Sequence, residues 1–217
     1  MLRLRDGEAV VASDGAGSFR ACRARRPTPR TFALEADGPL RSTAAPVPQL
    51  TVCLSLLKGE RTEWAVEKLT EAGVDEIVPL LCERTVVRPG EQGAGRRQRR
   101  LALVARQAAM QSRRLFLPRL LDPLDLRAAL ALGGERAFLA EPGGQSPTLA
   151  RPFALVGPEG GWSERELALA EREGAPLVAL GAGVLRAETA AVAAGLLLSA
   201  LRVGLFDPAR STGDRSR

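Results

Sequence analysis

The chain has 217 residues, of which 45% are hydrophobic and 26% charged, and its formal net charge is +6. This apolar content excludes a disordered chain, and the length predicts one domain of ordinary size, with or without a small appendage. Its apolar runs are shorter than the roughly 18–20 residues of a membrane span, and the first residues lack the apolar core of a secretion signal. We therefore expect a cytoplasmic protein that does not associate with membranes.

Several residue types that carry common chemistry are missing. The chain contains no His and no Tyr, and its three cysteines, Cys22, Cys53 and Cys82, form no CxxC pair. This pattern excludes a Ser-His-Asp triad, argues against a zinc site or any other metal, and predicts reduced cysteines that act as buried hydrophobic residues. Proton transfer would therefore depend on Asp, Glu, Lys, Arg or water.

The positive charge is concentrated in one segment. Residues 84–119 contain ten basic residues and one acidic residue, so this segment alone has a net charge of +9. A local basic patch is typical of a surface that binds nucleic acid. A solvated helix face in an arginine-rich protein is the alternative, and composition alone does not separate the two.

The N-terminal 45 residues predict a small β unit. Residues 8–12, 18–24 and 31–35 have the composition of short strands, with a turn at 14–17 and two prolines, Pro27 and Pro29, before the third strand. Residues 42–49 have the composition of a linker. We therefore expect a first domain at 1–45, a second at 46–206, and a polar tail at 207–217.

From residue 50 the pattern changes to alternating strands and helices, which is typical of an α/β fold. Asp122, Pro123 and Asp125 predict a helix start, and Ser163 with Glu166 predicts a capping box. A flexible loop is expected at 88–95. The predicted strands are 50–57, 74–81, 136–140, 153–156 and 177–180, and the predicted helices are 62–72, 96–113, one from 122, one from 163, and 188–203.

Two glycine-rich turns follow predicted buried strands, at 155–161 and at 180–190. In open α/β sheets, ligands bind beyond the carboxyl ends of the strands, so these turns are candidates for a binding site. The chain has no phosphate-binding P-loop sequence. A dinucleotide fold is disfavoured, because Gly181 and Gly183 lack the third glycine and Glu188 follows too soon to bind a ribose.

These turns carry a specific resemblance. The sequences LVGPEGGWS at 155–163 and LGAGVLRAETA at 180–190 resemble the RsmE family, the bacterial 16S ribosomal RNA uracil-N3 methyltransferases of the SPOUT superfamily. Three further pieces match in family order: WAVEKLTEAGV at 64–74, ERT at 83–85 and QSRR at 111–114. The resemblance covers residues 50–206, nearly all of the α/β part.

The resemblance implies a fold, a cofactor and partners. The fold is an α/β-knot: a mostly parallel sheet with helices on both faces and a deep C-terminal trefoil knot, preceded by a PUA-like β domain that binds RNA. Residues 1–45 are expected to form only part of that domain, because an early strand or two is missing. The implied cofactor is S-adenosylmethionine, and the implied substrate is 16S rRNA or the small ribosomal subunit. A homodimer is expected, because the helix at 188–203 is apolar on almost every side.

The resemblance also implies which residues hold the cofactor. Glycines would supply backbone groups and clearance, and apolar side chains would line a slot for adenine and the thioether, although each leucine also suits an ordinary core position. The expected residues are Leu139, Glu141, Leu155, Gly157, Glu159, Gly160, Gly161, Leu180, Gly181, Val184, Leu185 and Thr189.

The resemblance also implies which residues act in catalysis and in RNA binding. Arg186 would stabilise the uracil anion that attacks the methyl group. Glu188 would accept the proton, orient Arg186 or cap the last helix, and we favour the last two roles. The expected RNA-binding residues are Lys58, Arg84, Arg96, Arg97, Arg99, Arg100, Gln111, Arg113 and Arg114.

Two other functions remain open from the sequence. One is a catalytically silent RNA-binding or ribosome-assembly protein on a SPOUT scaffold, which the intact glycine-rich motifs disfavour. The other is a SPOUT methyltransferase that acts on tRNA, which the QSRR segment disfavours.

Overall fold

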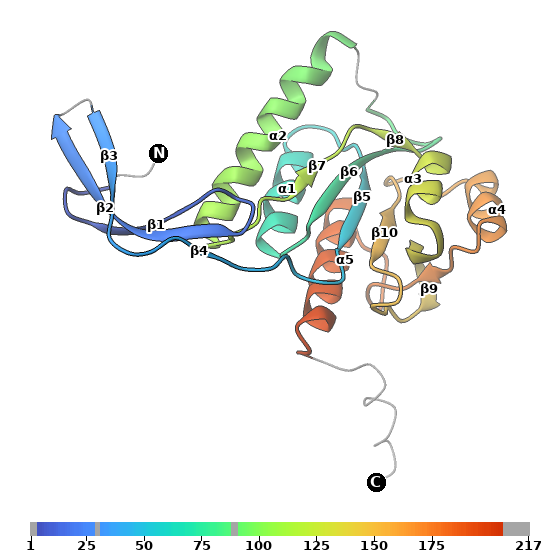
Figure 1. Ribbon diagram of the computed structural model, residues 1–217. Helices are drawn as coiled ribbons and strands as arrows, with labels where there is room; N and C mark the ends of the chain where they lie inside the picture. The colour runs from blue at the N-terminus through green and yellow to red at the C-terminus, as the bar shows by residue number, and fades with distance from the viewer. Residues whose placement is uncertain (1–3, 29–30, 88–90, 206–217) are drawn as a thin grey trace.

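Two β-sheets organise the chain in the computed structural model, which describes residues 4–28, 31–87 and 91–205 (Figure 1). The first sheet is antiparallel, with the order β1-β2-β3 and with β4 paired to β2. It extends to one side of the α/β part in Figure 1. Its strands are β1 (Ala9–Ser13), β2 (Ser18–Thr28), β3 (Thr31–Ala36) and β4 (Arg41–Ser42).

The antiparallel sheet contains the three expected strands, with two differences. The short strand β4 was not predicted, and its Ser42 lies in the segment expected to be a linker. β2 continues to Thr28 instead of ending at residue 24, because its pairing with β3 persists through a register shift to Thr31. The turn after β1 contacts the α/β part: the Gly15 carbonyl accepts from Leu117 N at 2.8 Å, and Gly17 N donates to the Leu115 carbonyl at 3.1 Å.

The second sheet has the order β11-β9-β10-β5-β6-β7, with β8 paired to β6, and its pairs are parallel. The predicted α/β class, with a mostly parallel sheet and helices on both faces, is therefore confirmed. The strands are β5 (Thr51–Ser55), β6 (Glu76–Leu81), β7 (Arg119–Leu120), β8 (Leu124–Asp125), β9 (Ala137–Gln145), β10 (Phe153–Val156) and β11 (Leu177–Val178). The helices are α1 (Arg61–Glu71), α2 (Glu91–Gln111), α3 (Leu126–Gly133), a short 3-10 turn (Gly134–Arg136), α4 (Glu164–Arg172) and α5 (Ala187–Arg202).

The alternation of side chains along the central strands divides the core in two. In β5, Val52 and Leu54 face a cluster with α1, α2 and α5, whereas Cys53 faces a cluster with α3 and Trp162. All five residues of β5 are buried, as expected for a strand covered on both faces. At Gly195, a side chain would meet Leu69 at 2.9 Å, so glycine allows α5 to lie close to α1.

Two sequence predictions about helix starts were wrong. Asp125, and not Asp122, caps α3: its side chain accepts from Ala128 N at 2.7 Å. Residues 124–125 pair with β6 as β8, which keeps Asp122 and Pro123 outside the helix. The predicted loop at 88–95 was too long, because α2 begins at Glu91, and residues 88–90 lie outside the described ranges. The tail expected at 207–217 also lies outside them.

The predicted capping box of α4 is confirmed. The Ser163 hydroxyl accepts from Glu166 N at 3.1 Å, and the Glu166 carboxylate accepts from Ser163 N at 2.8 Å. None of the helices in the described ranges has the length and apolar character that crossing a membrane requires.

Candidate functional site

The two glycine-rich loops meet at the carboxyl ends of β9 and β10 and form one cleft. The loop after β10 provides one wall, the loop between β11 and α5 provides the other, and β9 continues past the end of β10 to add a third side. The lining residues are Ala140, Glu141, Pro142, Val156, Gly157, Pro158, Glu159, Gly161, Trp162, Leu180, Gly181, Gly183, Val184, Leu185, Ala187 and Ala190.

Most of the expected cofactor residues come together here. Eight of the twelve line the cleft: Glu141, Gly157, Glu159, Gly161, Leu180, Gly181, Val184 and Leu185. Leu139 and Leu155 do not, because both are fully buried in the core on the α3 side of the sheet. Gly160 and Thr189 lie beside the cleft without lining it.

The glycines that begin and end the loop after β10 have different reasons: Gly157 makes room for Trp162, and Gly161 adopts a positive φ. The indole Nε1 of Trp162 donates to the Ala140 carbonyl at 3.1 Å, which ties the loop to β9. A side chain at Gly157 would meet the indole ring at 2.9 Å, and Gly161 has φ +69°, a conformation that favours glycine. Trp162 belongs to the LVGPEGGWS motif, but the sequence did not predict a role for this residue in the site.

Arg84 fastens the same loop from outside. Its guanidinium donates to the carbonyl oxygens of Gly160 at 2.7 Å and Trp162 at 3.1 Å. A Cβ at Gly160 would lie 3.4 Å from the Arg84 side chain, an ordinary van der Waals contact, so the packing of Arg84 does not by itself require glycine here. Next to it, Glu83 N donates to the Glu166 carboxylate at 2.9 Å. Arg84, expected to bind RNA, thus contacts the loop of the cleft.

Arg61, at the start of α1, connects the two loops and was missed by the sequence analysis. Its guanidinium forms an ion pair with Glu159 of the first loop and with Glu188 of α5 at 3.4 Å. The hydrogen bond from Arg61 lowers the pKa of Glu159, and the charges of Arg61, Arg186 and Lys58 act in the same direction. An arginine placed 98 residues before its partner has no local sequence signal.

The two expected catalytic residues differ in their surroundings. Arg186 is the exposed, extended N-cap residue of α5, beside the cleft residues Leu185 and Ala187. Glu188 is buried in the first turn of α5, where a carboxylate suits the helix dipole. The structure shows no side-chain hydrogen bond at this N-cap, and the partner of Glu188 is Arg61.

The cleft also contains a carboxylate that is harder to ionise. Burial raises the pKa of Glu141, in contrast to the lowered pKa of Glu159. The cysteines contribute no nucleophile: all three are buried, and burial raises the pKa of Cys82 to about 12 and also raises that of Cys53. Among the described residues, His, Cys, Asp and Glu form no cluster of three or more that would suit a metal ion.

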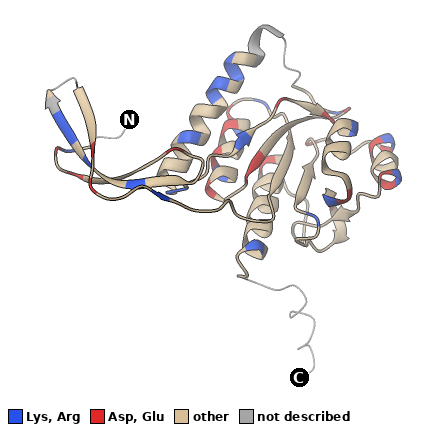
Figure 2. Ribbon diagram, in the orientation of Figure 1, with Lys and Arg blue, Asp and Glu red and all other residues tan. Residues whose placement is uncertain are grey.

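Most of the expected RNA-binding residues lie on or near α2, and Figure 2 shows basic residues along this helix. Arg96 and Arg99 are exposed, and Arg100 forms ion pairs with Glu60 at 3.5 Å and Glu63 at 3.2 Å. Gln111 and Arg113 are exposed at the C-terminal end of α2, and Lys58 is exposed before α1. Arg97 is half-buried.

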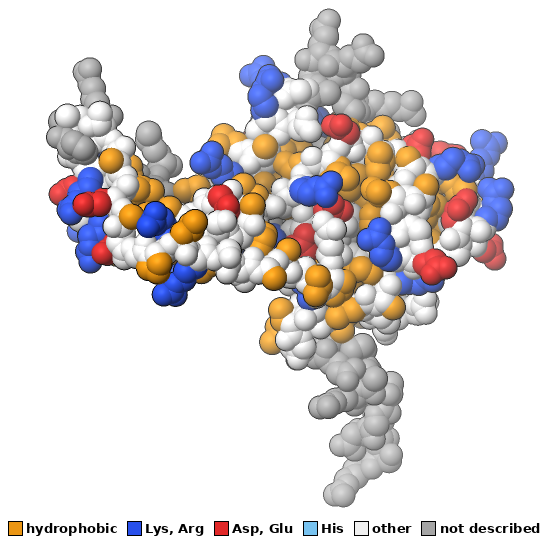
Figure 3. Space-filling model, in the orientation of Figure 1, with side chains coloured by type: hydrophobic (Ala, Val, Ile, Leu, Met, Phe, Trp, Pro, Cys, Tyr) orange, Lys and Arg blue, Asp and Glu red, His pale blue; other side chains and the backbone are white. Residues whose placement is uncertain are grey.

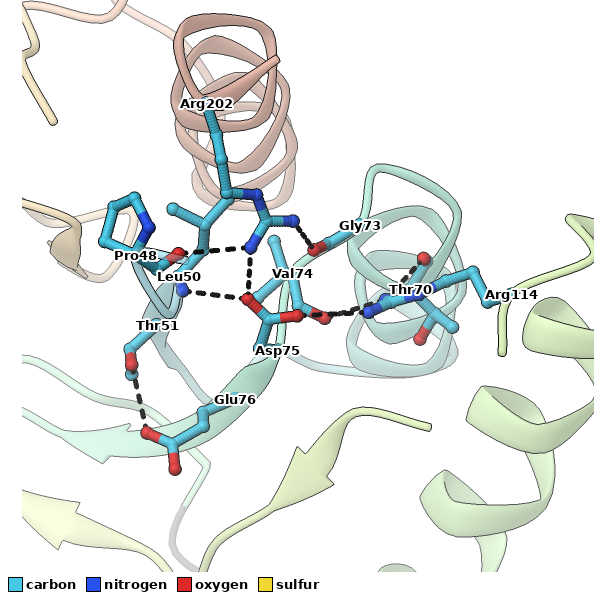
Figure 4. A network of polar contacts seen from close by, with 10 residues as sticks. All are labelled: Pro48, Leu50, Thr51, Thr70, Gly73, Val74, Asp75, Glu76, Arg114 and Arg202. Atoms are coloured by element: carbon cyan, nitrogen blue, oxygen red, sulfur yellow. Dashed lines mark hydrogen bonds and ion pairs between the residues drawn. The ribbon is translucent and has the colours of Figure 1, made fainter. Parts of the chain in front are cut away.

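Arg114 lies in a different environment, with a side chain only 12% exposed (Figure 4). It donates to the Thr70 and Val74 carbonyls at 2.9 and 2.8 Å and pairs with Asp75 at 3.3 Å. Arg202 of α5 contacts the same carboxylate from the other side. Arg114 therefore joins α1 to the turn before β6 and shares Asp75 with Arg202 of α5, so RNA would reach Arg114 only by displacing these partners.

Comparisons with known proteins agree on one family of RNA methyltransferases. A family model described as RNA methyltransferase domain matches residues 43–199. Ribosomal RNA small subunit methyltransferase E of Mycobacterium bovis is 34% identical over 88% of this chain and 78% of that protein. The protein of that name from Synechocystis is 31% identical over 93% of this chain and 69% of that protein. The solved structure of the Neisseria gonorrhoeae protein of that name, bound to S-adenosyl methionine, aligns with a TM-score of 0.77 and 28% identity, covering 92% of this chain and 85% of that chain.

Proposed function

Because the chain belongs to the ribosomal RNA small subunit methyltransferase E family, we propose that it transfers a methyl group from S-adenosylmethionine to N3 of a uridine in 16S rRNA. The observation that carries this proposal is the meeting of the two glycine-rich loops in one cleft at the carboxyl ends of β9 and β10. Residues 46–206 would form the catalytic domain, and the antiparallel sheet within residues 1–45 would contribute to RNA binding.

The cleft has the chemistry that this cofactor requires. Val156, Leu180 and Leu185 offer apolar walls for the adenine ring and the thioether carbons. The lining also includes the carboxylates of Glu141 and Glu159, of which Glu159 is already paired with Arg61. When bound, S-adenosylmethionine supplies an electrophilic methyl group. Two glycines of the lining, Gly181 and Gly183, have space for a side chain, and Gly181 serves here as the site for a blocking residue.

The protein must position the uracil and stabilise its anion. The N3 atom is a weak acid that is shielded by base pairing, so the target base has to be unpaired or splayed out. Arg186, which is exposed beside the cleft, would stabilise negative charge that develops on the uracil oxygens when N3 loses its proton. Glu188 would act as a positioning residue, because its ion pair with Arg61 holds α5 against α1.

RNA would approach over the basic surface of α2. Arg96 and Arg99 are free of the ion pairs that engage Arg100 within the described residues, so they are the stronger candidates for phosphate contacts. Such contacts position the RNA without reading its sequence. Arg84 and Arg114 would act indirectly, by fixing the cofactor loop and the helix ends, respectively.

The working unit would be a homodimer that pairs through α5. One stripe of this helix, including Ala191, Ala194 and Leu198, is buried within the chain. The opposite side remains apolar and partly uncovered, with Leu196 53% exposed. A second α5 would cover this side, in an interface of about 2,000 Å² or more.

Two measurements test the proposal. Calorimetry should show S-adenosylmethionine binding to the wild-type protein, loss of binding in Gly181→Val, and normal binding in Gly38→Val, a glycine of the N-terminal region with comparable space. Incubation with small-subunit rRNA should then create one reverse-transcription stop, because a methyl group on N3 blocks base pairing. Methylation without such a stop, or methylation of tRNA in preference to rRNA, would contradict the uracil-N3 assignment.

A further inference from the structure

A second pocket lies beside the cleft, between helices α1 and α2 and the strands β5, β6 and β7. Its walls are mostly apolar and include Leu54, Val66, Ile77, Leu101 and Leu120. It has a volume of about 100 Å³ and opens to solvent. For comparison, a closed cavity of about 150 Å³ accommodates a benzene ring. The pocket is therefore large enough for one edge of a flat ring but not for a whole nucleotide.

One guanidinium nitrogen of Arg97, a residue that lines this pocket, lacks a hydrogen-bond partner among the residues that the structure describes. This nitrogen, Nη1, is buried from solvent. A buried donor of this kind costs free energy unless something accepts its hydrogen bond. Asp122, also in the lining, already accepts from Gln98 at 3.3 Å and retains capacity to accept from a second donor.

The pocket and the cleft share one edge of the sheet. Leu54, in the pocket, pairs with Val156, in the cleft, on adjacent parallel strands. The first turn of α1 separates the two: Arg61 binds the loops of the cleft, and the next residue, Thr62, lines the pocket. A polymer that reaches the cleft therefore passes close to the pocket.

The surroundings of the pocket favour an anionic polymer. Arg96 and Arg99 are exposed on the same segment of α2 as Arg97. Figure 3 shows apolar side chains on the face between α2 and α3, next to basic ones on α2. A flat group with a carbonyl oxygen for Arg97, an N–H for Asp122 and flanking phosphates for the exposed arginines is a nucleobase of RNA.

We propose that this pocket binds a nucleobase that neighbours the target uridine, with Arg97 donating to a carbonyl oxygen of that base. This inference rests on the proposed function, since it assumes an RNA substrate. A uracil, cytosine or guanine carries the required carbonyl oxygen and N–H group. The pocket would hold the strand in register while the target base occupies the cleft.

The test uses the full-length protein and a single-stranded 16S rRNA fragment that contains the target uridine. Each flanking base is replaced in turn by an abasic site, and the dissociation constant is measured at fixed salt. For the wild-type protein, one abasic position should weaken binding by about tenfold or more, as expected for a lost hydrogen bond to a charged group. In Arg97→Gln that penalty should disappear, and the intact fragment should bind as weakly as the abasic one.

Two variants control the experiment. Arg99→Gln should weaken binding of all fragments equally and keep the abasic penalty, because it removes only a phosphate contact. Leu120→Phe, which fills the pocket and leaves Arg97 in place, should reduce the penalty. The inference is overturned if every abasic fragment binds as tightly as the intact one, or if Arg97→Gln keeps the full penalty. Calorimetry with S-adenosylmethionine separates this result from failure of the proposed function, since Arg97 variants should bind the cofactor normally.

Discussion

Asp75 is the anion that holds two buried arginines together, and removing its charge should strongly destabilise the fold (Figure 4). Its carboxylate accepts from Leu50 N at 2.9 Å, from Arg114 at 3.3 Å and from Arg202. The Arg202 and Arg114 side chains are only 7% and 12% exposed. In Asp75→Asn, two guanidinium groups would share a buried site without an anion, and an amide N–H would face one of them.

The magnitude follows from this burial. Removing one partner of a buried ion pair costs about 3–5 kcal/mol, because the remaining charge stays desolvated. Domains of this kind unfold with about 5–15 kcal/mol, so the variant would lose a large part of its stability. Both arginines also donate to backbone carbonyls, including Gly73 and Val74, and these bonds would persist. We therefore expect about 3–5 kcal/mol and not complete loss of the local structure.

Urea unfolding, followed by tryptophan fluorescence at one protein concentration, measures this change. The matched control is Asp37→Asn, which breaks the 3.0 Å pair with Arg23, where both side chains are about half exposed. That surface pair should contribute about 1 kcal/mol or less. A double variant, Asp75→Asn with Arg202→Met, should recover part of the loss, because one unpaired charge is removed. Equal costs for Asp75→Asn and Asp37→Asn would refute the reasoning.

Three other changes test the remaining assignments. Leu196→Arg should convert a dimer to monomers of 23.0 kDa in sedimentation, whereas the same change at Leu103, exposed on α2, should not. A monomeric, active wild-type protein would exclude the dimer. Replacing Arg96 and Arg99 by Gln should lower the slope of log affinity against log salt for single-stranded RNA by about 1.4. Replacing Arg165 and Arg172, the two exposed arginines of α4, by Gln should leave this slope unchanged. Glu141→Gln should match the wild-type stability below about pH 4 and exceed it as pH rises above that value, until the difference levels off where Glu141 is ionised in both the folded and the unfolded state. The reason is that burial raises the pKa of Glu141, so ionisation in the folded state costs stability. A difference that stays constant with pH would contradict that assignment.

The sequence predicted the elements of the α/β part well, because their signals are local. The buried runs of β5 and β10 and the capping box at Ser163 each occupy a few consecutive residues. The start of α3 was misplaced for a tertiary reason. Asp122-Pro123 is a good local start, but pairing of Leu124 with β6 keeps the chain extended for three more residues.

The sequence predicted the loops of the candidate site but not the arginine contacts that hold these loops in place. The glycine motifs located seven of the expected cleft residues, and the eighth, Glu141, lies in β9. Leu139 and Leu155 instead point to the opposite face of the sheet, because side chains alternate along a strand. Charge alone also could not separate Arg114 from Arg99. Both belong to the same basic segment, yet one is buried against Asp75 and the other is exposed.

The two arginines that hold the loops of the cleft, Arg61 and Arg84, come from the other end of the domain. Arg61 and Arg84 belong to the first strand–helix units, while the loops they hold follow β10 and β11. Their partners lie 76 to 127 residues away along the chain. The central pairing of β10 with β5 spans a similar separation, so the same long-range packing that builds the sheet also brings these arginines to the loops. The shape of the cleft therefore depends on contacts across the whole domain and not on the glycine motifs alone.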